Sequence, residues 1–290
     1  FSQPAYFAYD DVAVRFEKSS EEPEKAKFTI GDAEYETLQA AVDAVKDGET
    51  ITMLENVSGD GVVVASGKNF TIDFGGHVYT VDGKLVGSAG TETNGFQLLK
   101  DSTIVMKNGT LTSTNAKILV QNYANLTLED MNVDVSGAAG DCGQYALSNN
   151  CGDVNITGAT SITAKEGGVA FDVCCFANYP QVNVTVDTTG TISGTIEFSK
   201  SSGRTDEGNS SLTIKNINHE GSFSVAAGTE IPVAISGGTF SEAVPEKFCA
   251  EGFAPVAGEN GKYTVEEIQV QPVSVKVGGN AAALTKLKDD

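Results

Sequence analysis

The sequence contains no tryptophan, and its 19 lysine and arginine residues are outnumbered by 39 aspartate and glutamate residues. The formal net charge of -20 would repel the phosphates of nucleic acids and the headgroups of anionic lipids. No run of about 18 consecutive apolar residues occurs, which is the length that a membrane-spanning helix needs. The sequence therefore predicts neither a nucleic-acid partner nor a transmembrane segment.

The five cysteines lack the C-x-x-C spacing of zinc and redox sites, and their odd number predicts buried free thiols or one incidental disulfide. Cys142 and Cys151 are the most plausible pair, because only a short loop separates them. Neither His77 nor His219 has a second ligand at metal spacing, so we expect no metal centre and no cofactor. Calcium held in loops by acidic side chains stays an alternative, although the candidates show no defined ligand spacing: Asp141, Asp206 and Glu207.

Glycine, serine, threonine, asparagine and valine are abundant instead, and short apolar and polar alternations recur along the chain. Each unit alternates as a strand does, meets a glycine or asparagine, and resumes with a second short strand. The spacing of the units is typical of stacked repeats with parallel strands, in which like residues lie above like residues. The alternating apolar residues are Phe70 and Ile72, Ile104 and Met106, Leu126 and Leu128, Val154 and Ile156, Val182, Val184 and Val186, and Leu212 and Ile214.

A single helix is predicted, within the segment Thr37–Asn56. Its apolar stripe contains Leu38, Ala41, Val42 and Val45, while Gln39, Asp43 and Lys46 face away from the stripe. Thr37 is the expected N-cap and Gly48 the expected residue after the helix. We expect Leu38, Val42 and Val45 to cover the open end of the stack, against Ile51 and the unit of Phe70 and Ile72.

Three phrases resemble the parallel β-helix domains of the pectin-lyase-like superfamily, in the form found in surface proteins of Gram-positive bacteria: the helix followed by DGETITML, FTIDFGGHVYTV, and ISGGTFSEAVPEKFCAEGFAPVAGENGKYTV. The resemblance covers residues 27–266. It implies an all-β fold, a right-handed parallel β-helix (solenoid) with an N-terminal capping α-helix. Residues 1–26 are expected to be the end of a preceding module plus an acidic linker. Residues 267–290 resemble the start of a Big-type immunoglobulin-like module, or a linker.

Enzymes of this fold cleave glycans, so hydrolase and lyase activities are the enzymatic alternatives. A lyase needs a rigidly placed basic residue, whereas Arg15 precedes the repeats and Arg204 lies in a loop rich in serine and glycine. The NTD, paired DD, GHG and RIK motifs of the pectin hydrolases are not present in order. The remaining catalytic candidates are Asp172 and Glu197, about one repeat apart. The alternation predicts that both point outward between core residues, and a non-enzymatic protein is favoured.

Long insertions at residues 81–95, 136–150 and 199–209 would leave the stack at its corners and form a display surface. The candidate binding residues beside these loops are Tyr123, Tyr145, Tyr179 and Arg204. We therefore expect an extracellular, cell-surface module that binds a glycan or a host surface protein, or that serves as a spacer. Such a module would be a monomer within a longer chain. The alternative is a fibre or decoration module on the surface of a phage virion, where trimers are common.

Overall fold

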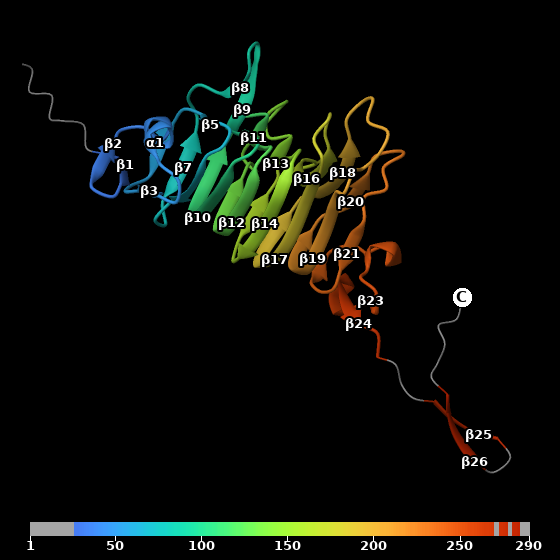
Figure 1. Ribbon diagram of the computed structural model, residues 1–290. Coiled ribbons are helices and arrows are strands. Elements are labelled where there is room, and N and C mark those ends of the chain that lie inside the picture. Colours follow the sequence, from blue (N-terminus) through green and yellow to red (C-terminus); the bar gives the residue numbers. More distant parts are fainter. Residues whose placement is uncertain (1–25, 270–272, 278–279, 285–290) are drawn as a thin grey trace, which may run out of the picture.

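The computed structural model describes residues 26–269, 273–277 and 280–284 (Figure 1). Most of the chain forms two largely parallel sheets, one of 16 strands and one of 8, stacked in register in a β-helix-like arrangement that is consistent with a β-solenoid. From β9 onward the chain passes from one sheet to the other and back, so that each repeat adds a layer to both sheets.

The larger sheet contains β1 (Phe28–Ile30), β2 (Ala33–Tyr35), β3 (Thr50–Met53), β4 (Val57–Gly59), β6 (Asn69–Asp73), β7 (Val78–Val81), β10 (Thr103–Ser113), β12 (Asn125–Asp134), β14 (Gly152–Gly158), β15 (Ser161–Thr163), β17 (Val182–Ser193), β19 (Ser211–Glu220), β21 (Val233–Ile235), β22 (Thr239–Phe240), β23 (Phe253–Ala257) and β24 (Tyr263–Glu267). The smaller sheet contains β5 (Val62–Val64), β8 (Val86–Ser88), β9 (Thr91–Leu98), β11 (Ile118–Asn122), β13 (Tyr145–Asn149), β16 (Val169–Cys175), β18 (Thr195–Lys200) and β20 (Phe223–Val225).

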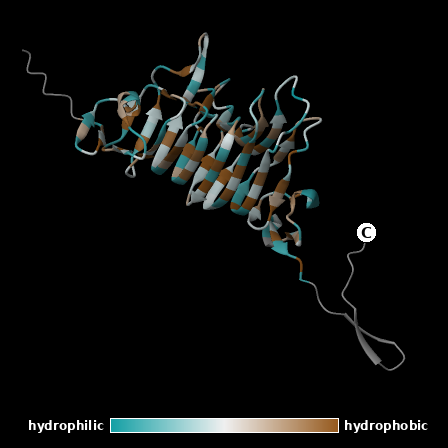
Figure 2. Ribbon diagram, viewed as in Figure 1, coloured by the Kyte–Doolittle hydropathy of each residue, from teal (hydrophilic) through white to brown (hydrophobic). Residues whose placement is uncertain are grey.

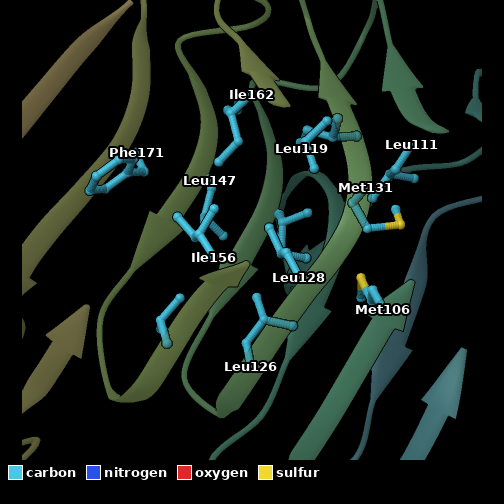
Figure 3. Packing of buried hydrophobic residues seen from close by; sticks show 14 of the residues in the cluster. Met106, Leu111, Leu119, Leu126, Leu128, Met131, Leu147, Ile156, Ile162 and Phe171 are labelled. Carbon is cyan, nitrogen blue, oxygen red and sulfur yellow. The ribbon is translucent and has the colours of Figure 1, made fainter. Parts of the chain in front are cut away.

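The predicted apolar pairs stack as two continuous rows inside the larger sheet. Parallel pairing places Ile104 beside Phe70 and Leu126, and Met106 beside Ile72 and Leu128. The same two rows continue through Val154 and Ile156, Val184 and Val186, and Leu212 and Ile214. All of these side chains are buried, and Figure 3 shows the middle of this core. Figure 2 shows hydrophilic and hydrophobic bands along the strands, as the period of two requires.

The paired short strands that the sequence predicts are joined into longer strands in β10, β12, β17 and β19, whereas β6 and β7, and β14 and β15, stay separate. Residues with positive φ occupy equivalent places within or at the end of three neighbouring strands: Asn108 (φ 58°), Asp130 (φ 53°) and Gly158 (φ 65°). Asparagine, aspartate and glycine are the residues that tolerate this conformation best. The chain therefore turns a corner at these positions while both halves of β10 and β12 keep parallel partners.

The helix α1 (Leu38–Ala44) lies at the N-terminal end of the stack, nearest to β1, β2 and β5. The Thr37 hydroxyl accepts a hydrogen bond from the Ala40 amide at 3.2 Å, which confirms the N-cap. Leu38, Val42 and Val45 are buried in the same core cluster as Ile51, Phe70 and Ile72, as predicted.

Two details of the helix differ from the prediction. Val45 is already non-helical (ψ 138°), so Gly48 does not follow the helix directly. The Lys68 ammonium instead donates to the carbonyls of Asp43 and Val45, each at 3.1 Å, which satisfies the end of the helix. Gln39 does not face away: its amide pairs with β5, accepting from the Val63 N–H at 2.8 Å and donating to the Val63 carbonyl at 3.0 Å.

At the other end, β22, β24 and β23 pair antiparallel and extend the larger sheet, followed along the chain by β25 (Val273–Val277) and β26 (Asn280–Leu284), which pair only with each other. Short 3-10 helices span Glu246–Phe248 and Glu259–Gly261.

The strand and linker predicted for residues 1–26 lie outside the described residues, except for Ala26. Among the predicted loops, 81–95 contains the β8–β9 hairpin. The 136–150 segment ends in β13, where the buried polar residues Ser148 and Asn149 interrupt the apolar alternation that marks the other strands.

Candidate aromatic cleft

Two of the predicted binding residues, Tyr123 and Tyr179, meet in one cleft. Tyr123 directly follows β11, and Tyr179 lies in the turn between β16 and β17. Their ring centroids are 5.1 Å apart at an interplanar angle of 38°, and the Phe176 ring lies 5.9 Å from that of Tyr123. The cleft has a volume of about 510 Å³. Stacked repeats explain this meeting, because turns that follow one sheet fall above one another in successive layers.

The rest of the cleft wall includes several polar residues and was not predicted from the sequence. Asn125 and Asn178 contribute amides, and Lys100 and Asp101 contribute an exposed ion pair with 3.8 Å between Nζ and Oδ2. Burial, and then the neighbouring Tyr179, raises the pKa of Tyr123 to about 12, so its hydroxyl keeps its proton at neutral pH. The cleft therefore combines aromatic faces with neutral donors and acceptors, the usual composition of a small-molecule site.

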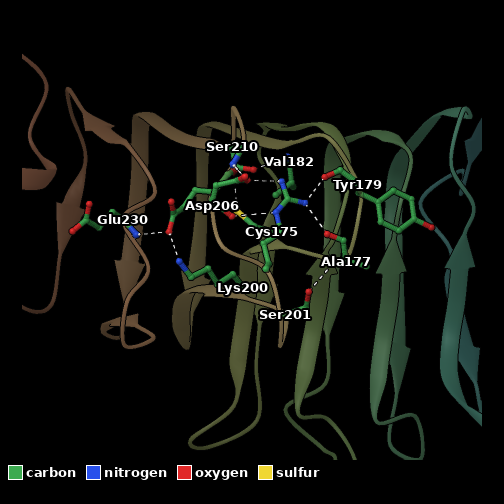
Figure 4. A network of polar contacts seen from close by, with 12 residues as sticks. Cys175, Ala177, Tyr179, Val182, Lys200, Ser201, Asp206, Ser210 and Glu230 are labelled. Atoms are coloured by element: carbon green, nitrogen blue, oxygen red, sulfur yellow. Dashed lines mark hydrogen bonds and ion pairs between the residues drawn. The ribbon is translucent and has the colours of Figure 1, made fainter.

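A second cavity of about 550 Å³ shares the turn at Ala177–Pro180 with the cleft and is otherwise lined by the 201–206 loop. The predicted binding residue Arg204 lies here, but its guanidinium is used within the protein. Nη1 donates to the carbonyls of Ala177, at 3.0 Å, and Tyr179, while Nε donates to the carbonyl of Asp206 at 3.1 Å (Figure 4). Arg204 therefore fixes the turn that carries Tyr179.

The same loop is held by further contacts across the layers. The Ala177 amide donates to the Ser201 hydroxyl at 2.7 Å, and the Val182 amide donates to the Ser210 hydroxyl at 3.0 Å. Lys200 and Glu207 form an ion pair of 2.8 Å. The Ser201 and Ser210 contacts reach the neighbouring turn of the preceding layer (Figure 4), whereas the Lys200–Glu207 pair joins the loop to β18 of its own layer. The loop therefore holds one wall of the cleft in place.

The two catalytic candidates lie side by side, as the sequence predicts. Asp172 and Glu197 are register partners on β16 and β18, and each lies between two core residues, so both side chains are on the outer face of the smaller sheet. Asp172 is nevertheless only 3% exposed, and its carboxylate accepts hydrogen bonds from the Asn149 amide and, at 3.2 Å, from the Ser148 hydroxyl. Neither carboxylate lines the aromatic cleft.

The groups around this pair determine the protonation of Asp172. Burial, together with the charge of Glu197, raises the pKa of Asp172 to about 8, although the hydrogen bond from Asn149 opposes the shift. Tyr145 donates from its hydroxyl to Glu197 Oε1 at 3.1 Å, and burial raises the pKa of this tyrosine. The predicted binding residue Tyr145 therefore contacts the carboxylate pair and does not line the cleft. At neutral pH Asp172 holds a proton.

All five cysteines are free thiols, so the pair Cys142 and Cys151 is not bridged. Cys151 lines the aromatic cleft, whereas the Cys142 thiol donates to the Asn115 carbonyl at 3.1 Å. Burial raises the pKa of Cys151 and that of Cys174, the latter to about 12. These thiols are therefore protonated and weakly nucleophilic at neutral pH.

Within residues 26–269 and the two C-terminal strands, no three histidine, cysteine or acidic side chains are grouped closely enough to hold a metal ion. Two of the three calcium candidates are engaged otherwise, since Asp206 pairs with Arg204 at 3.2 Å and Glu207 pairs with Lys200. No helix in the described part of the chain has the length and apolar character needed to cross a bilayer. No family model, curated protein or solved structure matches the chain.

Proposed function

We propose that the protein is a non-enzymatic glycan-binding module, a right-handed parallel β-helix of the pectin-lyase-like type displayed on the outside of a cell. The observation that carries the proposal is the cleft between Tyr123 and Tyr179, whose rings lie 5.1 Å apart in a cavity of about 510 Å³. The corners of a repeat stack are rigidly held, so a cleft built there is preorganised for a ligand.

The chemistry of the cleft favours a sugar over a purely apolar ligand. The C–H faces of a pyranose ring pack on aromatic rings, and its hydroxyl groups need both donors and acceptors. Tyr123 and Tyr179 offer the rings, and the Asn178 amide offers a donor and an acceptor. Asn125 offers its Nδ2 as a donor, since its Oδ1 already accepts from the Asp153 amide at 2.9 Å. A host surface protein bearing glycans would be recognised through the same contacts.

The test is a glycan array followed by calorimetric titration with the whole chain. We expect Tyr123→Ala and Tyr179→Ala each to weaken binding by about tenfold, because each removes a stacking ring and about 1.4 kcal/mol corresponds to tenfold. Tyr145→Phe is the matched control, since Tyr145 lies on the carboxylate pair outside the cleft and should leave the affinity unchanged. If no glycan binds, or if all three variants bind alike, the proposal is wrong and a spacer is favoured.

Glycan hydrolysis is the second candidate, supported by the in-register pair Asp172 and Glu197 and by the raised pKa of Asp172, about 8. Two neighbouring carboxyl groups, one of them with a raised pKa, are the arrangement that glycosidases use. The burial of Asp172 argues against it, because a sugar must reach the acid. Release of reducing ends by the wild type, abolished in both Asp172→Asn and Glu197→Gln, would establish this activity; a complete lack of release would exclude it for the glycans tested.

A further inference from the structure

The cations around the cleft already have partners within the protein, and this arrangement indicates which ligand charge the cleft favours. Proteins recognise the carboxylate of an acidic sugar most strongly through a bidentate arginine. Arg204 is the arginine beside the cleft, and its side chain is only 10% exposed. Its donors reach the carbonyls of Ala177, Tyr179 and Asp206, and Nη2 also reaches Asp206 Oδ1 at 3.2 Å. Freeing this guanidinium would release the turn that carries Tyr179.

The nearby lysines are paired as well. Lys200 contacts Glu207 at 2.8 Å, and Lys100, in the cleft wall, contacts Asp101 at 3.8 Å. Asp101, the partner of Lys100, is exposed and also lines the cleft, so the pair adds no net positive charge there. A ligand carboxylate would therefore meet two lysines that already have acidic partners, and a chain whose formal net charge is -20.

From this arrangement we infer that the cleft selects neutral glycans and discriminates against sugars that carry a carboxylate, such as uronates and sialates. The inference rests on the proposed function and names its ligand class. Neutral hydroxyl groups match the amides of Asn125 and Asn178 and the protonated hydroxyl of Tyr123. Among the described residues that line or adjoin the cleft, an acidic sugar finds no unpaired cation, and it suffers repulsion that is worth several-fold in affinity at a partly exposed site.

The experiment compares matched pairs of ligands on the whole chain: a neutral oligosaccharide that binds on the array, and the same oligosaccharide extended or substituted with one carboxylate sugar. We expect the acidic member to bind at least about fivefold more weakly near 0.05 M NaCl, and the difference to shrink near 0.5 M as salt screens the repulsion. The affinity for the neutral member should change little with salt.

Asp101→Asn supplies the structural test, because asparagine tolerates the positive φ of 64° at this position. The variant removes the negative charge of Asp101 and the partner of Lys100. It should therefore reduce the difference in affinity between the neutral and the acidic ligand. Asp32→Asn is the control: it lies in the exposed β1–β2 turn and changes the net charge equally, and it should leave the difference in affinity unchanged. Equal or tighter binding of acidic sugars that depends on Tyr123 and Tyr179 would overturn the neutral-ligand inference alone. Absence of any glycan binding would overturn the proposed function together with it.

Discussion

At the scale of single residues, Asp172 and His219 are ionisable groups at positions that the repeats bury. His219 falls in register between Ile192 and Phe240, in an inward row of the larger sheet, and its ring lies 5.2 Å from that of Phe223. Its Nε2 contacts the Gly194 carbonyl at 3.0 Å, while Nδ1 has no partner among the described residues. Burial lowers the pKa of His219 and raises that of Asp172, so both groups are uncharged at neutral pH.

Replacing Asp172 by asparagine should change how stability depends on pH. The pKa of Asp172 is about 8 in the folded protein and about 3.9 when unfolded, so between these values only the folded state holds the proton. The free energy of unfolding therefore falls as pH rises through this window. We expect Asp172→Asn to be more stable than the wild type by about 1 kcal/mol or more near pH 8, and the gap to shrink toward pH 4.

Urea unfolding at a series of pH values measures this difference. The lowered pKa of His219 acts in the opposite sense, since the unfolded state takes up the histidine proton below about pH 6.5 and stability falls as the pH drops. That contribution is present in both proteins and cancels in the comparison. Parallel stability curves for wild type and Asp172→Asn would show that the buried aspartate is not the titrating group.

At the scale of elements, a helix side chain completes the edge of a sheet. The strand β5 ends the smaller sheet on the N-terminal side, where its backbone would otherwise lack a partner. The Gln39 amide takes the place of the missing strand by bonding both the N–H and the carbonyl of Val63, and it also donates to Asp43 at 2.8 Å. An unpaired strand edge is a site of aggregation, so the contact protects this end of the stack.

We expect Gln39→Ala to lower the free energy of unfolding by about 1–3 kcal/mol, because it leaves two backbone groups of β5 unsatisfied. The Val63 amide should also lose protection from hydrogen exchange, measured by mass spectrometry or NMR. Lys46→Ala, an exposed change just beyond the helix, is the control and should alter neither quantity by more than about 0.5 kcal/mol. Unchanged protection of Val63 in Gln39→Ala would show that β5 does not depend on the helix.

The sequence predicts the rows of the core far better than the cleft. Alternation with period two places Ile104, Leu126 and Val154 inward, and stacking like residues brings them into one row. The meeting of Tyr123 with Tyr179 depends on the exact length of each intervening turn, which alternation does not encode. The backbone contacts of Arg204 and the pairing of Gln39 were likewise hidden, since a polar residue on an exposed face gives no sign of its partner.

At the scale of the whole molecule, the larger sheet of the described stack ends in antiparallel strands on both sides. β1 and β2 extend it at one end, and β24 and β23 extend it at the other. The formal net charge of -20 adds repulsion between copies. These features favour a protein that works as a single chain, whereas trimers are common in the alternative role on a phage virion.

Sedimentation or light scattering of the whole chain should give the mass of one chain, independent of protein concentration and of salt up to about 0.5 M. Salt is varied because screening removes the charge repulsion and exposes any weak association. A threefold mass that persists on dilution would contradict a single-chain module and favour a fibre or decoration protein.

The Gln39 contact also bears on how such a protein can change its length during evolution. Because a side chain occupies the place of the next strand beside β5, a new layer cannot be added there without displacing the helix. Between β10 and β19, in contrast, each layer pairs in register with two similar neighbours, so loss or duplication of one layer leaves matching partners on both sides. Related proteins of different length should therefore arise by duplication of internal layers, while the helix stays unchanged at the N-terminal end of the stack.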